Sequence, residues 1–60
     1  MREVIVYDSF LNNDGTRYKR EGYLIKFISL NNDIMAIVEL SDGEIYFTNI
    51  NLVKFKYPTN

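Results

Sequence analysis

The sequence predicts an all-β domain in which five antiparallel strands form a small barrel, with a long loop between the first two strands. β-Branched and aromatic residues dominate, whereas Ala36 is the only alanine and Pro58 the only proline. Such a composition favours pleated, half-buried backbone. No window spaces its apolar residues as a helix does. Short polar segments separate the apolar stretches, as turns separate the strands of an antiparallel meander.

Five stretches have the length and the side-chain pattern of strands. They span 3–8, 22–30, 34–41, 44–50 and 52–56. The longest connection, SFLNNDGTRYKRE, joins the first strand to the second. Without an internal repeat or a linker, residues 1–57 are expected to form one domain, followed by a short polar tail at 58–60.

The segment LSDGEIYF at 40–47 contains the strongest turn signal. As a two-residue turn, Asp42-Gly43 needs a positive φ at its centre, which glycine supplies and aspartate tolerates. That register pairs Val38 with Phe47, so that apolar side chains of both strands share one face. The corner is therefore expected to turn the chain and to carry no chemistry.

The preceding corner, NND at 31–33, is expected to hold an even number of loop residues. A two-residue turn at 32–33, or a four-residue loop, pairs Phe27 with Val38 and Lys26 with Glu39. Opposite charges then meet on the outer face, whereas a three-residue loop would turn Lys26 inward at a large desolvation cost. The two turns together predict an inner set of Tyr23, Ile25, Phe27, Ala36, Val38, Leu40, Ile45 and Phe47.

Size and composition limit how this chain can be stabilised. Sixty residues bury only about 60% of the surface of the extended chain, so a domain of this size is marginally stable. The sequence has no cysteine and no histidine, which removes disulfides and the usual soft metal ligands. The remaining sources of stability are efficient packing of the core and association with another chain.

Charge and hydropathy favour a soluble, cytoplasmic protein. No apolar run approaches the roughly 18 residues of a membrane span, and no secretory leader opens the chain. A net charge of −1 argues mildly against a general nucleic-acid binder. The many asparagines, isoleucines and lysines indicate an AT-rich bacterium or its phage as the source.

The strand order and three segments carry a family resemblance. VIVYDSF at 4–10 looks like the opening ALYDY motif of SH3 domains, with Tyr7, Asp8 and Phe10 in matching places. EGYLIKFI is similar to the glycine-led second strand of KOW and Tudor modules, and TNINLVKF to the short helical turn before the last strand. The chain thus resembles the SH3-like small barrels, which implies a binding module.

Two departures narrow what this resemblance implies. The chain has no tryptophan, so the residue that lines the proline-peptide groove of SH3 domains is missing. Arg17, Lys19 and Arg20 occupy the long loop, which tends to be acidic in peptide-binding SH3 domains. The resemblance therefore does not imply that this chain binds proline-rich peptides or that it has a Tudor aromatic cage.

The residues offer no catalytic or metal constellation. Without histidine and cysteine, neither Cys–His nor Ser–His–Asp chemistry can be built. NNDGT at 12–16 lacks the alternating oxygen ligands and the closing glutamate of an EF-hand. We expect no enzyme, no catalytic residue, no cofactor and no metal. Seven of the eight carboxylates are scattered over predicted turns and strands: Asp8, Asp14, Glu21, Asp33, Glu39, Asp42 and Glu44.

The predicted register leaves apolar side chains on the outer face as well, which is unusual for an antiparallel meander with one side in water. Two interpretations remain open. The long loop covers part of this face, or the face is a contact surface for a protein partner or a second copy of the chain. The candidate partner-binding residues are Leu24, Ile28, Met35, Ile37 and Tyr46.

Two clusters, RYKR at 17–20 and KFKY at 54–57, combine cations with aromatic rings, as single-stranded nucleic-acid surfaces do. In the other interpretation, Phe55 belongs to the core and the lysines form a solvated edge. The candidate nucleic-acid-binding residues are Arg17, Tyr18, Lys19, Arg20, Lys54 and Lys56.

The sequence predicts a non-enzymatic accessory or regulatory module that binds protein and does not act on a small-molecule substrate. Nucleic-acid binding is the alternative. The two differ in where the cations lie. One continuous basic patch beside exposed aromatics favours nucleic acid, whereas dispersed cations and a bare Ile28/Met35/Ile37 patch favour protein contact.

Overall fold

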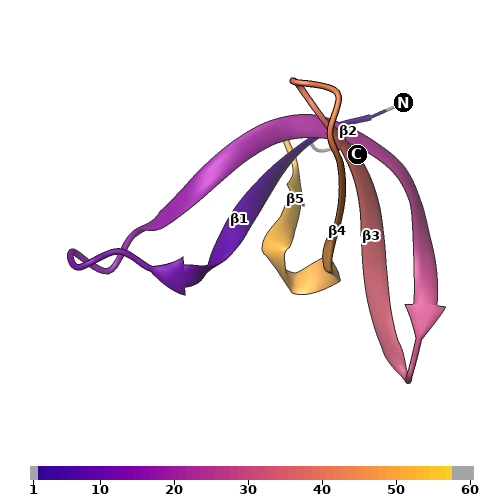
Figure 1. Cartoon of the computed structure of the whole chain (residues 1–60), viewed down its shortest axis with the longest axis horizontal. Coiled ribbons are helices and arrows are strands. Elements are labelled where there is room, and N and C mark those ends of the chain that lie inside the picture. Colours follow the sequence, from indigo (N-terminus) through magenta and orange to yellow (C-terminus); the bar gives the residue numbers. More distant parts are fainter. Residues whose placement is uncertain (1, 58–60) are drawn as a thin grey trace.

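The computed structural model describes residues 2–57, which form one five-stranded antiparallel sheet (Figure 1). The strands are hydrogen-bonded in the order β4-β3-β2-β1-β5. The prediction of an all-β domain with five antiparallel strands is confirmed, and the expected tail at 58–60 lies outside the described residues. The elements are β1 (Glu3–Leu11), β2 (Arg17–Leu30), β3 (Asp33–Leu40), β4 (Ile45–Asn49), the 3₁₀ turn η1 (Ile50–Leu52) and β5 (Val53–Phe55).

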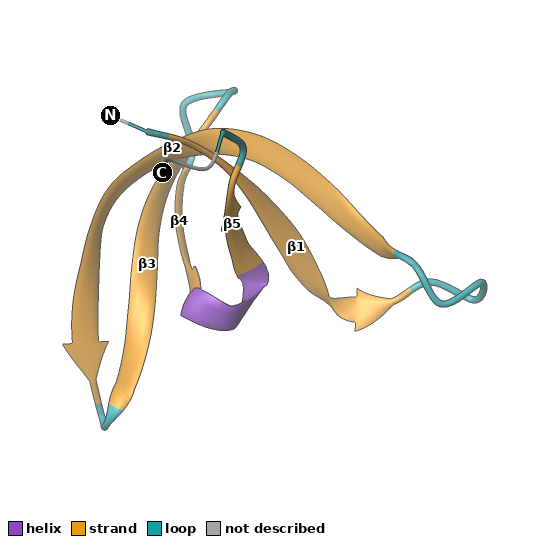
Figure 2. Cartoon of the chain, turned by 180° about the vertical axis from the view of Figure 1, so that it is seen from behind, coloured by secondary structure: helices purple, strands orange, loops and turns teal. Residues whose placement is uncertain are grey.

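The sheet bends strongly, but its ladders do not close it. β2 is a 14-residue strand that arches over the molecule, while β4, η1 and β5 lie beneath the arch (Figures 1 and 2). β4 and β5 are the two edges of the sheet, and no ladder joins them within residues 2–57. The described ladders thus form one open, curved sheet, and the closed barrel expected from the sequence is not part of this hydrogen-bond pattern.

The connection expected as a long loop is mostly strand. β1 continues to Leu11 and β2 begins at Arg17, so only residues 12–16 lie between the strands. The register shifts just before Leu11, and Nη1 of Arg17 donates to the carbonyls of Asp8 (2.9 Å) and Ser9 (2.7 Å). These bonds satisfy the backbone acceptors of the bulge. The result is a two-stranded β1–β2 arm, which projects to the left in Figure 1.

Both Asp-Gly corners form a three-residue loop, which corrects the two-residue turn expected at Asp42-Gly43. The Gly43 N–H donates to the Leu40 carbonyl (2.8 Å), and the Leu40 N–H donates to the Glu44 carbonyl (2.8 Å). Gly43 has a φ of 90°, the left-handed conformation that follows a type I turn in such loops. The Asp42 carboxylate accepts the Glu44 N–H (2.9 Å). Residues 12–16 repeat this pattern at the tip of the arm.

The third loop residue shifts the β3–β4 register by one position. Val38 lies opposite Tyr46 instead of Phe47. Because side chains alternate between the two faces of a strand, the shift reverses β4. Tyr46 packs against the core and Thr48 is buried, whereas Ile45 and Phe47 are 54% and 56% exposed. The predicted inner placement of Ile45 and Phe47 is therefore wrong.

A two-residue turn joins β2 to β3. Asn31 and Asn32 have φ values of 50° and 69°, as a type I′ turn requires at both central positions. The loop is even, as expected, but begins one residue earlier. Phe27 consequently lies opposite Ala36 instead of Val38.

A bulge in β2 corrects a further part of the predicted register. The pairing with β3 shifts between Leu24 and Lys26, which exchanges the two faces of the strand at this point. Leu24 packs against the core, whereas Tyr23 and Ile25, expected inside, are exposed. Lys26 lies opposite Ile37, so its expected cross-strand pair with a glutamate is not formed.

The core occupies the inner face of the curved sheet. Gly22 belongs to it because a Cβ atom there would lie 2.6 Å from the Glu39 carbonyl oxygen and 2.9 Å from Val38 Cγ1. Leu24, Tyr46 and Val53 pack around the buried cluster. The buried apolar residues are Val4, Val6, Ala36, Val38 and Leu40.

Candidate functional site

Apolar side chains from three strands meet on the face opposite the core. In antiparallel ladders, directly opposed residues share a face. Ile28 lies opposite Met35, and Ile37 lies opposite Phe47. Tyr23 and Ile45 both lie opposite Glu39, which alternation along β3 puts on the same face. We call this set the outer surface: Tyr23, Ile28, Met35, Ile37, Ile45 and Phe47.

The outer surface is large for a protein of this size. Tyr23, Ile45 and Phe47 are each about half exposed. A large aromatic side chain can bury about 150–250 Å², so these three leave on the order of 300 Å² of apolar area in contact with water. The largest apolar patch of a typical monomer is of this size and is often functional. Met35 adds an unbranched side chain that can adapt to a partner.

The structure brings together three of the five partner-binding residues expected from the sequence. Ile28, Met35 and Ile37 lie side by side on the outer surface. Leu24 and Tyr46 pack against the core instead, because the bulge and the three-residue loop reverse their strands locally. Sequence reasoning missed Ile45 and Phe47, and only the parity of the Asp-Gly loop could have revealed them.

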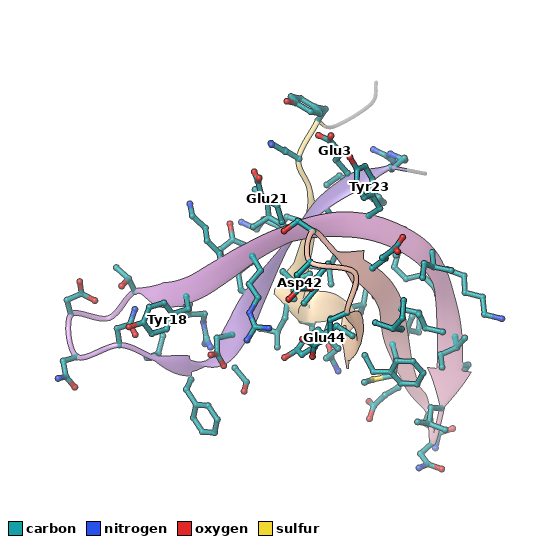
Figure 3. The ribbon with its side chains drawn as sticks, turned by 45° about the horizontal axis from the view of Figure 1, so that its top comes forward. Glu3, Tyr18, Glu21, Tyr23, Asp42 and Glu44 are labelled. Carbon is teal, nitrogen blue, oxygen red and sulfur yellow. The ribbon has the colours of Figure 1, made fainter. Side chains whose placement is uncertain are left out.

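The basic residues of the arm lie on both of its faces. Nη1 of Arg17 is engaged with the bulge carbonyls, and Lys19 lies opposite Tyr7. Arg20 lies opposite Val6 on the inner face, and its guanidinium carbon is 5.6 Å from the centre of the Tyr46 ring. Tyr18 is exposed on the arm (Figure 3).

The lysines of the C-terminal segment have local partners. Lys54 lies opposite Ile5, with its Nζ 5.8 Å from the centre of the Tyr7 ring. Lys54 and Arg17 both line a surface hollow beside η1. Lys56 forms a salt bridge with Glu21, with 2.7 Å between Nζ and Oε1. Lys54 and Arg17 thus lie at one hollow, whereas Lys56 is neutralised by Glu21 and lies apart from them.

The carboxylates engage in local contacts. Tyr23 and Glu3 lie close together (Figure 3), and the Tyr23 hydroxyl donates to Glu3 Oε1 over 3.4 Å. The hydroxyl and the N–H of Thr16 donate to Asp14 and lower the pKa of its carboxyl. A carboxyl group that acts as a general acid at neutral pH needs a raised pKa, so the lowered pKa of Asp14 does not suit it to this role. In the described part of the chain, no three histidine, cysteine or acidic residues gather as a metal site would require.

The Glu21–Lys56 ion pair predicts a pH dependence of stability. Hydrogen bonding to Lys56 lowers the pKa of Glu21 below its ordinary 4.5, and the same bond raises the pKa of Lys56 above 10.5. The Glu21 contribution is present above the ordinary carboxyl pKa and is lost as pH falls through the lowered one. The Lys56 contribution is lost as pH rises through its raised pKa.

Thermal unfolding of Glu21→Gln between pH 2 and 7 checks this dependence. We expect the melting temperature of the variant to lie slightly below that of the wild type at pH 7 and to converge with it in acid. The effect is small because exposed ion pairs contribute little. Parallel pH profiles for the two proteins would contradict the prediction.

Comparison of the chain with family models, with curated proteins and with solved structures finds no match. The SH3-like resemblance consequently rests on strand pattern and on the quoted segments. No helix within residues 2–57 has the length and apolar character needed to cross a membrane.

Proposed function

We propose that the protein is a non-enzymatic binding module that contacts a protein partner through the outer surface. One observation carries the proposal: the three-residue loop at the β3–β4 corner turns Ile45 and Phe47 outward, next to Ile37 and Met35. What distinguishes Phe47 from the exposed Phe10 of the arm is that it lies directly opposite Ile37 on a face with further apolar side chains. Burial against a partner removes this area from water and contributes to affinity.

The positions of the cations support protein contact over nucleic acid. Arg20 lies on the inner face, Lys56 is paired with Glu21, and Arg17 holds the bulge. A backbone-tracking groove needs several free cations along one path. An accessory or regulatory role suits a module that binds a partner and whose sequence contains no histidine and no cysteine.

We further propose that the curved sheet has the SH3-like fold, as a barrel whose edge strands β4 and β5 are not joined by a ladder within residues 2–57. The 3₁₀ turn η1 lies between β4 and β5, where the resemblance places a short helical turn. The long β2 pairs with β1 over residues 17–23 and with β3 over residues 22–30, and its bulge lies just past the end of the β1 ladder. Such a bent strand lets one sheet fold over its own core.

Substitution of Phe47 by glutamate tests the binding function. Phe47→Glu places a charge on the outer surface opposite Ile37, and we expect partner affinity to fall by about 30-fold or more, the effect of losing a contact of about 2 kcal/mol. Quantitative pull-down from the native host, comparing wild type and variant as bait, measures this loss.

Phe10→Glu is the matched control, because Phe10 is 78% exposed but lies on the arm. We expect this variant to capture the same partner as the wild type. Circular dichroism verifies that both variants remain folded. Equal capture by wild type and Phe47→Glu, or no partner for the wild type, would overturn the proposal.

A further inference from the structure

The C-terminal half of β2 has one free edge. β1 pairs with β2 only as far as Tyr23, and the last backbone bond on this side runs from the Leu24 N–H to the Arg2 carbonyl (2.9 Å). Beyond it, no ladder among residues 2–57 covers residues 26–30 on the side away from β3. In Figure 1 this end of β2 is the outermost strand of its half of the sheet. Such an edge is a template for another strand.

The ladder geometry shows which backbone groups this edge presents. Leu30 and Asp33 flank the two-residue turn and therefore form a hydrogen-bonded pair. Hydrogen-bonded and non-hydrogen-bonded pairs alternate along an antiparallel ladder. The N–H and C=O groups of Phe27 and Ser29 consequently point away from β3. Two donors and two acceptors are thus aligned along the free edge.

The β2–β3 hairpin is apolar on both faces at this end. Phe27 and Ile34 continue the inner face beyond the core and are 43% and 50% exposed. Leu30 continues the outer face and is also 50% exposed. Strands that are apolar on both faces are typical of sheets covered on both sides. An edge of this kind calls for a neighbouring strand with apolar residues on both of its faces.

We infer that a second copy of the chain occupies this edge, with its β2 antiparallel to the first and a two-fold axis at Ile28. This register brings Phe27 of one copy opposite Ser29 of the other, so their outward N–H and C=O groups pair. The two apolar faces then become continuous across the axis. An isologous contact of this kind closes as a dimer.

The charges of the hairpin support a second copy as the occupant. From Ile25 to Ile37 the only charged residues are Lys26 and Asp33. The inferred register places Lys26 beside Leu30 of the second copy, and Asp33 of that copy lies across the ladder from this Leu30. The two charges are then about 10 Å apart at Cα, two strand spacings, within reach of an extended lysine. The two-fold axis produces two such contacts between Lys26 of one copy and Asp33 of the other.

Within one chain the same two residues cannot meet. Lys26 and Leu30, the residue opposite Asp33, are four positions apart along β2, which is about 13 Å in a strand. If charge reversal at Lys26 is compensated by charge reversal at Asp33, the two side chains must interact between copies and not within one chain. The inferred contact is confined to residues 26–30 of the two strands and the side chains beside them, so we expect a weak, micromolar dimer.

Sedimentation equilibrium from about 10 μM to 1 mM tests the inference. We expect the mass of the wild type to rise from the 7.1 kDa of one chain towards twice that value. Lys26→Glu and Asp33→Lys should each weaken the dimer about tenfold, and the double variant should restore it. Lys19→Glu, an equivalent charge reversal on the arm, should leave the dimer intact.

Ser29→Pro provides an independent variant. It removes an N–H that points to the second copy and leaves the β2–β3 ladder complete, so we expect a folded monomer. A constant mass of 7.1 kDa for the wild type, or single charge variants that the double variant does not rescue, would overturn the inference. A monomer that still captures a partner through Phe47 would refute the dimer alone, because the outer-surface function does not depend on it.

Discussion

Replacing Gly22 by alanine is expected to lower the free energy of unfolding by about 2–3 kcal/mol, as overpacking of a filled core does. The new Cβ would lie 2.6 Å from the Glu39 carbonyl oxygen, which belongs to the backbone of the neighbouring strand. Only a shift between β2 and β3 can relieve this contact. A 60-residue domain has a total stability of about 3–9 kcal/mol, so this single methyl group removes a large fraction of it.

Gly15→Ala is the matched control for this effect. Gly15 has a φ of 85°, and nothing lies within 4 Å of a Cβ atom built there. Its substitution adds backbone strain without a steric clash and should cost about 1 kcal/mol. Urea unfolding of the two variants measures the difference. Equal losses at both glycines would show that the close approach of the strands at Gly22 is absent in solution.

Truncation of two neighbouring aromatic residues should have opposite consequences. Tyr46 packs against the core, so Tyr46→Ala is expected to cost about 2–3 kcal/mol, somewhat less than for a fully buried ring. Phe47 is 56% exposed on the outer surface, and Phe47→Ala should cost less than about 1 kcal/mol. Chemical denaturation of both variants in the same buffer gives the comparison directly.

This pair of variants tests the register of β4. With a two-residue Asp-Gly turn, Phe47 would face the core and Tyr46 would face water, and the two losses would change places. The three-residue loop gives the order stated above because it turns β4 over. A larger loss for Phe47→Ala would also remove the basis for the proposed outer surface.

The β3–β4 corner shows why sequence alone could not predict the whole fold. Aspartate followed by glycine suits both the two-residue turn and the loop in which glycine occupies the left-handed third position. The two choices differ by one residue, and each gives β4 a plausible apolar face, with Ile45 and Phe47 or with Tyr46. Alternation alone does not discriminate between them, so the position of the turn was predicted correctly and its parity was not.

The alternation of β3 was easier to predict. Ala36, Val38 and Leu40 are buried, as the pattern predicts, because β3 has a hydrogen-bonded neighbour on each side. The bulge after Leu24 has no sequence signal such as a glycine or a proline. It therefore reversed the expected placement of Tyr23.

The candidate site, like the fold, was predicted from the sequence only in part. Ile28, Met35 and Ile37 lie on regular parts of their ladders, and alternation places them correctly on the outer surface. Their neighbours from β4 depend on the loop and were missed. The placement of Arg20 on the inner face depends on the pairing of β1 with β2, which no short-range pattern specifies.

The pairing of β5 with β1 sets the order in which the chain can assemble. Every other ladder joins consecutive strands, but Val4 lies opposite Phe55. Hairpins of consecutive strands form within microseconds, whereas this closure must bring together nearly the two ends of the chain and lose the corresponding entropy before any contact compensates. The contact order of this small protein is therefore dominated by its shortest strand, and the folding rate should depend on how readily that strand docks.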